Sequence, residues 1–415
     1  MARRKTKAIR YDSCGRVLNR GESQRKDGRY MYQWADSFTG KRMTVYADTL
    51  KALREEEERI AADVHDGIRV DASQLTVDML FEAMMLKKKG LRENTLRTYR
   101  KIYGIYCADT IGKRKVRDIR PMDIEALYGS IFDSGHSGTT LQLVNAVLTF
   151  CFKLAVKNDF IRRNPCEGVL SEFLKGRGWK PSKRTAVSDS DLTRFFQYAE
   201  SRASVSDECI LPVIKVMLLT GCRVSEVLGL IPSDIDYKGR TISVSRELVR
   251  LSGFQDKKAR FVVTETKTTA GTRVVPMSAD CAKAVSDALQ FRMLHGGHVT
   301  VDGVSGFIFV NRDGGLLYHS LVNGYIHQTV KAFNADEEKA AKADGRDPEL
   351  IADFTCHKLR HTYAARAVEN DVNPKLLQAV LGHKDMSTTM DVYAEFRTAK
   401  RKEAFEGLRQ IAKIA

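Results

Sequence analysis

Apolar residues recur at intervals of three and four through the middle of the chain, which is the spacing of one helix face. Four segments show this spacing: TVDMLFEAMMLKKK, ENTLRTYRKIYGIYC, PMDIEALYGSIF and TTLQLVNAVLTFCFKLAVK. Pro121 opens the third segment, where the first turn of a helix tolerates the missing amide hydrogen of proline. The pattern predicts an all-helical domain over residues 74–175.

The N-terminal region has a different pattern, with short runs of strand-forming residues between turn-prone stretches. The runs are GRVLN, GRYMYQWADSF and KRMTVYA, and the stretches GESQRKDG and FTGK separate them as turns. The next stretch, TLKALREEEERIAADVHDG, has the spacing of an amphipathic helix with an acidic solvent face. Residues 1–66 are therefore predicted to form a small three-stranded sheet packed on one helix.

Helices and strands are mixed in the third region, residues 187–415. Ser188 is the expected cap of a helix, and CILPVIKVMLLTGCRVSEVLGL has the pattern of a long apolar helix interrupted at Gly221. RTISVSREL, ARFVVTETK and TRVVPM are expected strands, of which the last two form a hairpin around the turn TTAG. The segment GRGWKPSKRTA, residues 176–186, is an expected linker. We predict a multidomain α+β fold whose third domain is mainly helical with a small antiparallel sheet.

The charge of the chain adds an expectation about its partner. A net charge of +16 and a pI near 9.4 favour a polyanion, most simply nucleic acid. Residues 1–47 hold 12 Lys and Arg against 4 Asp and Glu, so the basic charge lies on the predicted strands and the acidic charge on the helix. This segregation favours a DNA-reading sheet over the alternative, a solvated α+β domain without a partner. The helical domain holds 17 basic against 11 acidic residues, which fits either a grip on the DNA backbone or a plain bundle.

Basic and aromatic side chains of the strands and the linker are the expected DNA contacts. Those of the N-terminal domain are Arg16, Arg20, Arg25, Lys26, Arg29, Tyr30, Lys41 and Arg42. Those of the linker are Arg177, Lys180, Lys183 and Arg184.

The sequence shows no pattern of cofactor, metal or membrane chemistry. Its eight cysteines are scattered without a C-x-x-C pair, which indicates a reducing compartment rather than disulfides or zinc. Phosphate-binding, H-E-x-x-H and G-x-S-x-G motifs are absent from it. We see no stretch of the roughly 18 apolar residues that a membrane span needs, and the basic MARRKTKAIR has no apolar run behind it.

Four short patterns in the third region carry candidate chemistry. LLTGCRVSEVLGL holds Arg223 and Glu226 on one helix face, TKTTAGTRVVP holds Lys267, CHKLRHTYAA holds His357 and Arg360, and LGHKDMSTTMDVYA holds His383 and Tyr393. Each pattern alone has an ordinary explanation: a paired arginine, a solvated lysine, or a tyrosine of the core. His357 and His361 have the spacing of two metal ligands, but no third ligand accompanies them.

The residues around His383 predict how it is placed. Asn373 and Pro374 have the cap and first-turn pattern of a helix that Gly382 ends. Ser387 is the expected cap of the next helix, which carries Tyr393. His383 and Tyr393 are thus expected on two closely joined elements.

Together the four patterns resemble the tyrosine recombinase (phage integrase) family, in that family's order of Arg, Lys, His-x-x-Arg, His and Tyr. The helical region resembles the family's core-binding domain, and residues 1–66 resemble the arm-type DNA-binding domain of integrases from conjugative transposons. The resemblance implies a nucleophilic tyrosine that forms a 3′-phosphotyrosyl bond to DNA. It implies the same catalytic set here, with Glu226 in support: Arg223, Lys267, His357, Arg360, His383 and Tyr393.

The chemistry explains why these residue types are needed. Two arginines are always charged and can fork onto the non-bridging oxygens of a phosphodiester, with His383 as a further donor. A tyrosine of pKa about 10 needs a base, for which His357 is the candidate, and Lys267 is implied as the acid for the leaving 5′ oxygen. The phosphotyrosyl ester keeps the bond energy, so neither ATP nor a metal is expected.

The resemblance also implies partners. These are core-type and arm-type sites on double-stranded DNA, a tetramer assembled on DNA, an excisionase and a host DNA-bending protein, all in the bacterial cytoplasm at the nucleoid. The apolar stripe Ala404, Leu408, Ile411 and Ala415 is expected to pack either on its own domain or on a neighbouring protomer. Two alternatives stay open: a type IB topoisomerase-like enzyme, and a catalytically silent DNA-binding architectural protein.

Overall fold

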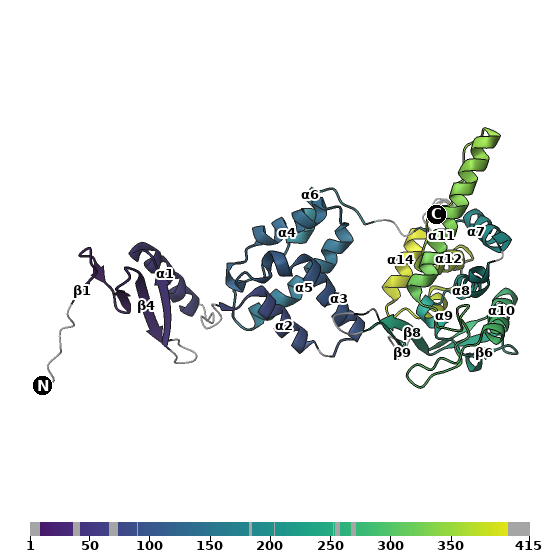
Figure 1. The fold of residues 1–415 in the computed structure, drawn as a ribbon, viewed down its shortest axis with the longest axis horizontal. Helices are drawn as coiled ribbons and strands as arrows, with labels where there is room; N and C mark the ends of the chain where they lie inside the picture. The colour runs from purple at the N-terminus through teal and green to yellow at the C-terminus, as the bar shows by residue number, and fades with distance from the viewer. Residues whose placement is uncertain are drawn as a thin grey trace, which may run out of the picture. The chain divides into compact units, whose positions relative to one another are not determined.

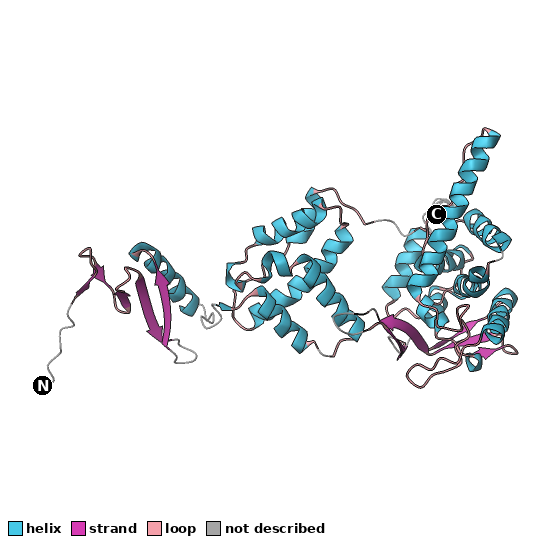
Figure 2. Ribbon diagram, in the orientation of Figure 1, coloured by secondary structure: helices cyan, strands magenta, loops and turns pink. Residues whose placement is uncertain are grey.

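The structure is a computed structural model of the 415-residue chain. It describes residues 9–35, 42–65, 74–88, 90–181, 185–202, 204–251, 253, 258–266 and 271–396. The chain divides into two compact units, Met1–Ser182 and Lys183–Ala415, and their boundary falls inside the predicted linker. Helices and small antiparallel sheets build both units, which confirms the predicted fold class (Figure 2). The predicted residues that lie outside the described part are Lys41, Lys183, Arg184, Lys267, Ala404, Leu408, Ile411 and Ala415.

The N-terminal part contains a three-stranded antiparallel sheet packed on one helix, α1 (Figure 1). The sheet order is β3-β4-β5, and β1 and β2 form a separate pair. Leu50 and Leu53 of the helix pack on Tyr30 of the sheet. The elements are β1 (Arg10–Tyr11), β2 (Val17–Leu18), β3 (Glu22–Gln24), β4 (Tyr30–Ala35), β5 (Arg42–Ala47) and α1 (Leu50–His65).

One strand of this sheet differs from the prediction. GESQ was expected in a turn, but Glu22–Gln24 form β3, whereas the run GRVLN contributes only to the β1–β2 pair. The reason is tertiary. The buried carboxylate of Glu22 accepts hydrogen bonds from Arg54 of α1 at 2.9 Å and from the Asn19 amide at 2.6 Å. A polar residue thus stabilises a strand that has no apolar pattern.

The helical part of the first unit confirms the four predicted helices and adds a fifth, α6. They are α2 (Val77–Lys87), α3 (Glu93–Tyr106), α4 (Pro121–Asp133), α5 (Gly138–Lys157) and α6 (Val169–Gly176). A π-helical turn (η2, Ala108–Gly112) and a 3-10 turn (η3, Val116–Asp118) connect α3 to α4. Pro121 stands in the first turn of α4, as predicted.

α5 has the length and apolar composition of a membrane span, which corrects the expectation that no segment of this kind exists. One face of α5 nevertheless lies in the core of the helical domain, where Leu141, Leu148 and Phe152 are buried. A central helix of a bundle needs a wide apolar face, so its composition alone does not distinguish it from a span.

The second unit is mainly helical. Its helices are α7 (Asp189–Arg202), α8 (Val205–Thr220), α9 (Val224–Leu228), α10 (Ala279–His295), α11 (His319–Asp344), α12 (Cys356–Glu369), α13 (Pro374–Leu381) and α14 (Met386–Phe396), with a 3-10 turn η4 (Pro232–Asp234). Its strands are β6 (Ile235–Asp236), β7 (Thr241–Val244), β8 (Arg246–Leu251), β9 (Arg260–Glu265) and β10 (Arg273–Pro276). The hydroxyl of Ser188 accepts from the Asp191 amide at 3.0 Å, which confirms the predicted cap of α7.

The strand pairing corrects the predicted hairpin around TTAG. β9 pairs with β8 and β10 pairs with β7, rather than with each other. Glu265 lies opposite Arg246, and Arg273 lies opposite Val244. Val244 and Arg246 are separated by Ser245 alone, so β10 and β9 pair with neighbouring positions of the chain. Lys267 lies outside the described residues. Alternation alone predicts strands but does not say which strands pair.

Candidate active site

The first part of the site is the sharp end of α8 at Gly221. Gly221 has a left-handed backbone with φ of 67°, which favours glycine. An added Cβ would also lie 2.5 Å from Tyr363 Cδ1 and 2.9 Å from Leu381 Cδ2. The chain can therefore turn tightly here only without a side chain. The turn places Arg223 at the N-cap of α9, with its side chain 37% exposed.

Glu226 holds Arg223 in place. Its fully buried carboxylate accepts from the backbone amide of Arg223 at 2.8 Å and from the guanidinium of Arg223 at 2.7 Å. It also accepts two hydrogen bonds from Arg273, at 3.1 and 2.9 Å. Burial would raise the pKa of Glu226, but the hydrogen bonds and charge of Arg273 and the charge of Arg223 hold that pKa below its usual value. Glu226 is thus ionised and holds the guanidinium of Arg223, and its supporting role in catalysis stays a prediction.

Arg360 of α12 lies in the interior of the site, 5% exposed. Its two terminal nitrogens donate to the backbone carbonyls of Gly221 at 2.8 Å and Leu381 at 2.6 Å. Burial and the neighbouring charge of Arg223 lower the pKa of Arg360 to about 10, so it stays protonated at neutral pH. Arg360 therefore joins three separate segments of the chain at one point.

His383 follows α13 directly, as predicted. The side chain of Asn373 accepts from the Lys375 amide at 2.8 Å, and Gly382 ends the helix with φ of 65°. Nδ1 of His383 lies 3.0 Å from the hydroxyl of Thr389 on α14. Because α14 begins at Met386, Ser387 is inside its first turn, which corrects the predicted cap.

The environment of His383 keeps its ring neutral. Burial, together with the positive charges of Arg360 and Arg223, lowers the pKa of His383 to about 4. When Nδ1 of the neutral ring faces Thr389, Nε2 can still form a hydrogen bond with another group. Arg360 also donates to the carbonyl of Leu381, two residues before His383, so the imidazole and this guanidinium lie in one neighbourhood.

We expect this shift to appear in the pH dependence of unfolding. The unfolded chain protonates His383 near its ordinary pKa of 6.5 and the folded chain near 4, so this contribution to stability is complete above pH 6.5. It is lost as the pH falls from about 6.5 to about 4. Urea denaturation at several pH values measures the free energy of unfolding. In the variant His383→Gln, this free energy should fall less steeply between pH 6.5 and 4 than in the wild type. His298 is exposed, and the variant His298→Gln should show the wild-type slope. Equal slopes for wild type and His383→Gln would contradict the assignment.

His357 lies on α12, one turn before His361. Their rings meet edge to face, with centroids 4.6 Å apart and planes at 87°. His357 and Arg360 share the helix, as the spacing predicted. Within the part of the chain that the structure describes, no group of three or more His, Cys, Asp or Glu could hold a metal ion.

Tyr393 occupies a core position in this structure. Its ring is 4% exposed and packs with Ala364, Val368, Leu377 and Leu381. Its hydroxyl donates to the backbone carbonyl of Val372, in the turn before α13. The arginines and His383 are therefore brought together, whereas the hydroxyl of the predicted nucleophile is held by the backbone.

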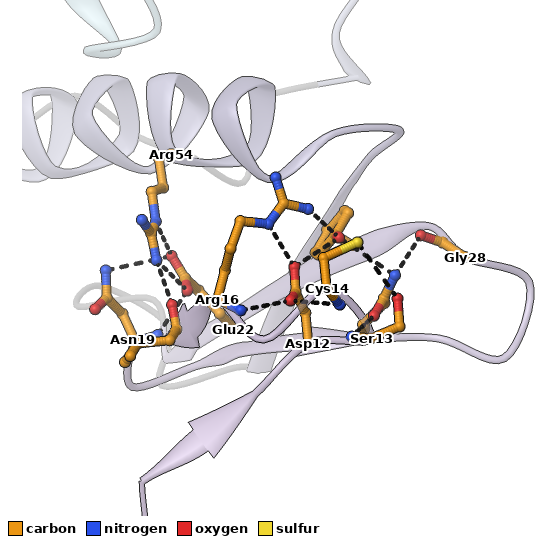
Figure 3. Close-up of polar contacts among 11 residues, drawn as sticks. Asp12, Ser13, Cys14, Arg16, Asn19, Glu22, Gly28 and Arg54 are labelled. Atoms are coloured by element: carbon orange, nitrogen blue, oxygen red, sulfur yellow. Dashed lines mark hydrogen bonds and ion pairs between the residues drawn. The ribbon is translucent and has the colours of Figure 1, made fainter.

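The predicted DNA contacts of the N-terminal domain fall into two groups. Most are exposed, namely Arg16, Arg20, Arg25, Lys26, Arg29 and Arg42. Tyr30 instead is buried, and its hydroxyl donates to Asp12 at 2.9 Å and accepts from Arg16 at 2.7 Å. Figure 3 shows Arg16 and Asp12 in this network, with Arg54 reaching down from α1 to Glu22. The prediction that Tyr30 contacts DNA is therefore corrected, because its side chain belongs to the core.

Sequence reasoning missed the uncharged residues on the outer face of this sheet, the face that also carries Arg42. Residues alternate along a strand, and Tyr30 of β4 faces the helix. The alternate positions form the opposite face, where Gln33 pairs with Thr44 and Met31 pairs with Tyr46. Alternation within YMYQWA and RMTVYA was the signal that could have found these residues.

The two linker residues among the predicted DNA contacts that the structure describes have different surroundings. Arg177 pairs with Asp133 at 3.1 Å and lies over the rings of Phe132 and Phe173, so its side chain belongs to the helical domain. Lys180 is exposed. The start of the predicted linker is therefore packed, because α6 continues to Gly176.

Comparisons with known proteins decide the family. Residues 186–400 match the model of the phage integrase family, and residues 6–64 match that of the DNA binding domain of tn916 integrase. The chain belongs to the phage integrase family. This confirms the resemblance that the four sequence patterns indicated, and with it a tyrosine-type site-specific recombinase.

Several relatives match nearly the whole length of this chain. The transposase from transposon Tn916 of Enterococcus faecalis is 29% identical over 398 residues, which cover 93% of each chain. A XerC-like tyrosine recombinase of Caldanaerobacter subterraneus is 22% identical over 391 residues, which cover 89% of this chain and 92% of that protein. The solved Tn1549 transposon integrase in complex with transposon right end DNA has a TM-score of 0.68 at 23% identity. It covers 79% of this chain and 99% of that one, and it shows the same fold.

Proposed function

We propose that this recombinase cuts DNA with Tyr393 in a site made by Arg223, Arg360 and His383. The observation that carries the proposal is the meeting of α9, α12 and the end of α13, which places two guanidinium groups and one imidazole in a single neighbourhood. Each arginine is oriented by a carboxylate or by backbone carbonyls and keeps further N–H groups for a phosphate. Donors held in advance in this way stabilise the charge of a transition state.

The reaction balances without a metal or nucleotide. The Tyr393 oxygen forms a bond to phosphorus while the bond to the 5′ oxygen breaks. His357 takes the phenol proton, and Lys267 gives a proton to the leaving oxygen. Attack requires the hydroxyl to exchange the Val372 carbonyl for the phosphate. In the reverse step a 5′ hydroxyl attacks the phosphotyrosyl ester, which rejoins the strands.

Its cellular role follows from the likeness to the Tn916 transposase. We assign the chain to integration and excision of a mobile element such as a conjugative transposon, in the bacterial cytoplasm at the nucleoid. The N-terminal domain, 1–66, would hold arm-type sites through the outer face of β4 and β5, where Gln33 and Thr44 can meet base edges. The helical domain, 74–175, and the catalytic domain, 187–415, would grip core-type sites.

Assembly on DNA is part of the proposal. A tetramer would exchange strands between two duplexes, and the stripe that begins at Ala404 would dock on a neighbouring protomer. An excisionase and a host DNA-bending protein would set the direction of the reaction.

The test is trapping on a nicked attachment-site duplex, after sequencing of element–chromosome junctions has defined that site. We expect a covalent adduct between the protein and the 3′ phosphate, visible as a slower band in denaturing gels. Tight binding without an adduct would favour a silent architectural protein. Relaxation of plasmids that lack any attachment site would favour a topoisomerase.

Lys267→Ala gives a separate prediction about the acid. On a normal phosphodiester, cleavage should slow by about 10²-fold or more, because general acid catalysis typically contributes that much. A substrate with a bridging 5′ thiol has a leaving group that needs no proton, so the same variant should cleave it at close to the wild-type rate. Equal slowing on both substrates, measured in single turnover, would remove Lys267 as the acid.

A further inference from the structure

Arg273 is a buried arginine that the proposed reaction does not use. It is the first residue of β10, and its side chain is 6% exposed. Its terminal nitrogens donate to both carboxylate oxygens of Glu226, at 3.1 and 2.9 Å. The same guanidinium donates to the carbonyl of Gly271 at 2.9 Å and, through Nε, to the carbonyl of Val380 at 2.5 Å. One side chain therefore contacts three segments that each carry a proposed catalytic residue.

We propose that Arg273 is a positioning residue for DNA cleavage, an inference that rests on the proposed function above. It fixes Glu226, and through Glu226 it fixes the guanidinium of Arg223. It fastens Gly271, at the end of the segment that contains Lys267. It also fastens the end of α13, immediately before His383.

The first step concerns Glu226. A buried carboxylate is costly unless several donors surround it. Arg223 alone supplies one side-chain and one backbone donor, and its guanidinium is partly exposed. Arg273 supplies the remaining donors from the buried side, so Glu226 stays ionised and in one orientation. A lysine could hold the charge but not span both oxygens, because only a guanidinium presents a planar fork.

The second step concerns the end of α13. The amides of Gly382 and His383 donate to the carbonyls of Ala379 and Gln378, at 3.2 Å each, which closes the helix in a Schellman motif. That motif leaves the next two carbonyls, of Val380 and Leu381, for partners outside the helix. Arg273 takes the first and Arg360 takes the second. Two arginines thus anchor the residues directly before His383.

If Arg273 had only a structural role, its variant should behave like that of a half-buried arginine elsewhere in the same domain. Arg246, with a side chain 21% exposed, provides that comparison. Arg246 of β8 pairs with the buried carboxylate of Asp234 and donates to the carbonyl of Gly229. It has the same kind of partners as Arg273, but within the described residues no hydrogen bond joins it to Glu226 or to α13. The variant Arg246→Lys should therefore show the loss of stability that follows from removing such a guanidinium, without an effect on the catalytic residues.

The experiment measures single-turnover cleavage and DNA affinity of the full chain on the nicked attachment-site duplex. For Arg273→Lys we expect cleavage at saturating protein to fall about 10- to 100-fold, by analogy with the loss of a residue that orients a metal ligand in other enzymes. The Kd for DNA should change less than threefold. For Arg246→Lys we expect a similar loss of thermal stability with cleavage near the wild-type rate. The double variant with Glu226→Gln should cleave no slower than the slower single variant, because both act on one contact.

The outcomes separate this inference from the proposed function. No adduct with wild-type protein would overturn the recombinase site itself. A wild-type adduct together with a wild-type rate for Arg273→Lys would overturn only the role of Arg273, and so would equal slowing by Arg246→Lys. If Arg273→Lys does not fold, Glu226→Gln tests the same contact in a chain of unchanged volume, and a wild-type cleavage rate there also overturns the inference.

Discussion

Tyr393→Phe should abolish the covalent adduct while leaving DNA binding intact. The variant removes one oxygen, so the ring can keep its packing with Ala364, Val368, Leu377 and Leu381. It loses the hydrogen bond to the Val372 carbonyl, which should lower the unfolding free energy by only about 1 kcal/mol. Cleavage should fall by about 10⁴-fold or more, because removing the nucleophile leaves only binding and charge stabilisation. Denaturing gels of the trapped complex measure the adduct, and band shifts measure the Kd.

The matched control for this prediction is Tyr363→Phe. Tyr363 packs against the same cluster, and no catalytic role is assigned to it. Its variant should form the adduct at the wild-type level. An adduct formed by Tyr393→Phe would show that another residue is the nucleophile and would remove the central assignment.

The variant Arg360→Lys tests whether cleavage needs only a positive charge at the phosphate or also the planar guanidinium. Lysine keeps the positive charge but has no planar fork, so it cannot hold the carbonyls of Gly221 and Leu381 and a phosphate oxygen together. We expect single-turnover cleavage to fall about 10²- to 10³-fold, as for the loss of one donor from an oxyanion site. The loss of buried hydrogen bonds should also lower the unfolding free energy by about 1–3 kcal/mol.

A second arginine of α12 provides the control for Arg360. Arg366 pairs with Asp189 at the surface, and Arg366→Lys should change neither cleavage nor stability measurably. Cleavage by Arg360→Lys within threefold of wild type would mean that the guanidinium fork does not contact the reacting phosphate.

Some features of the fold could be predicted because their causes are local. The helical spacing of apolar residues predicted α2 to α5. The ends of α13 were predicted from the backbone preferences of Asn373, Pro374 and Gly382. Gly221 was visible as a helix break for the same reason, since a left-handed turn favours glycine. Arg223 does pair with Glu226, but as the extended N-cap of α9 and not as a residue on the same helix face, which corrects the predicted arrangement while the cause stays local.

Other features had no local signal. β3 forms because Arg54, 32 residues away, holds Glu22. Tyr30 lies in the core because Asp12 and Arg16 satisfy its hydroxyl there. The same applies to β9 and β10, whose partners are β8 and β7 rather than each other. Each of these depends on a partner distant in the chain, which a pattern of neighbouring residues does not contain.

The sequence by itself determined the family, the candidate residues and the helices that carry most of them, because motif order and hydrophobic spacing are properties of neighbours. Only the tertiary structure decided how those residues are arranged. It brought Arg273 to Glu226 across 47 residues and to Val380 across 107, and it placed the hydroxyl of Tyr393 on the Val372 carbonyl. The physical reason is that burial and hydrogen bonding depend on which segments meet, and this is known only once the chain is folded.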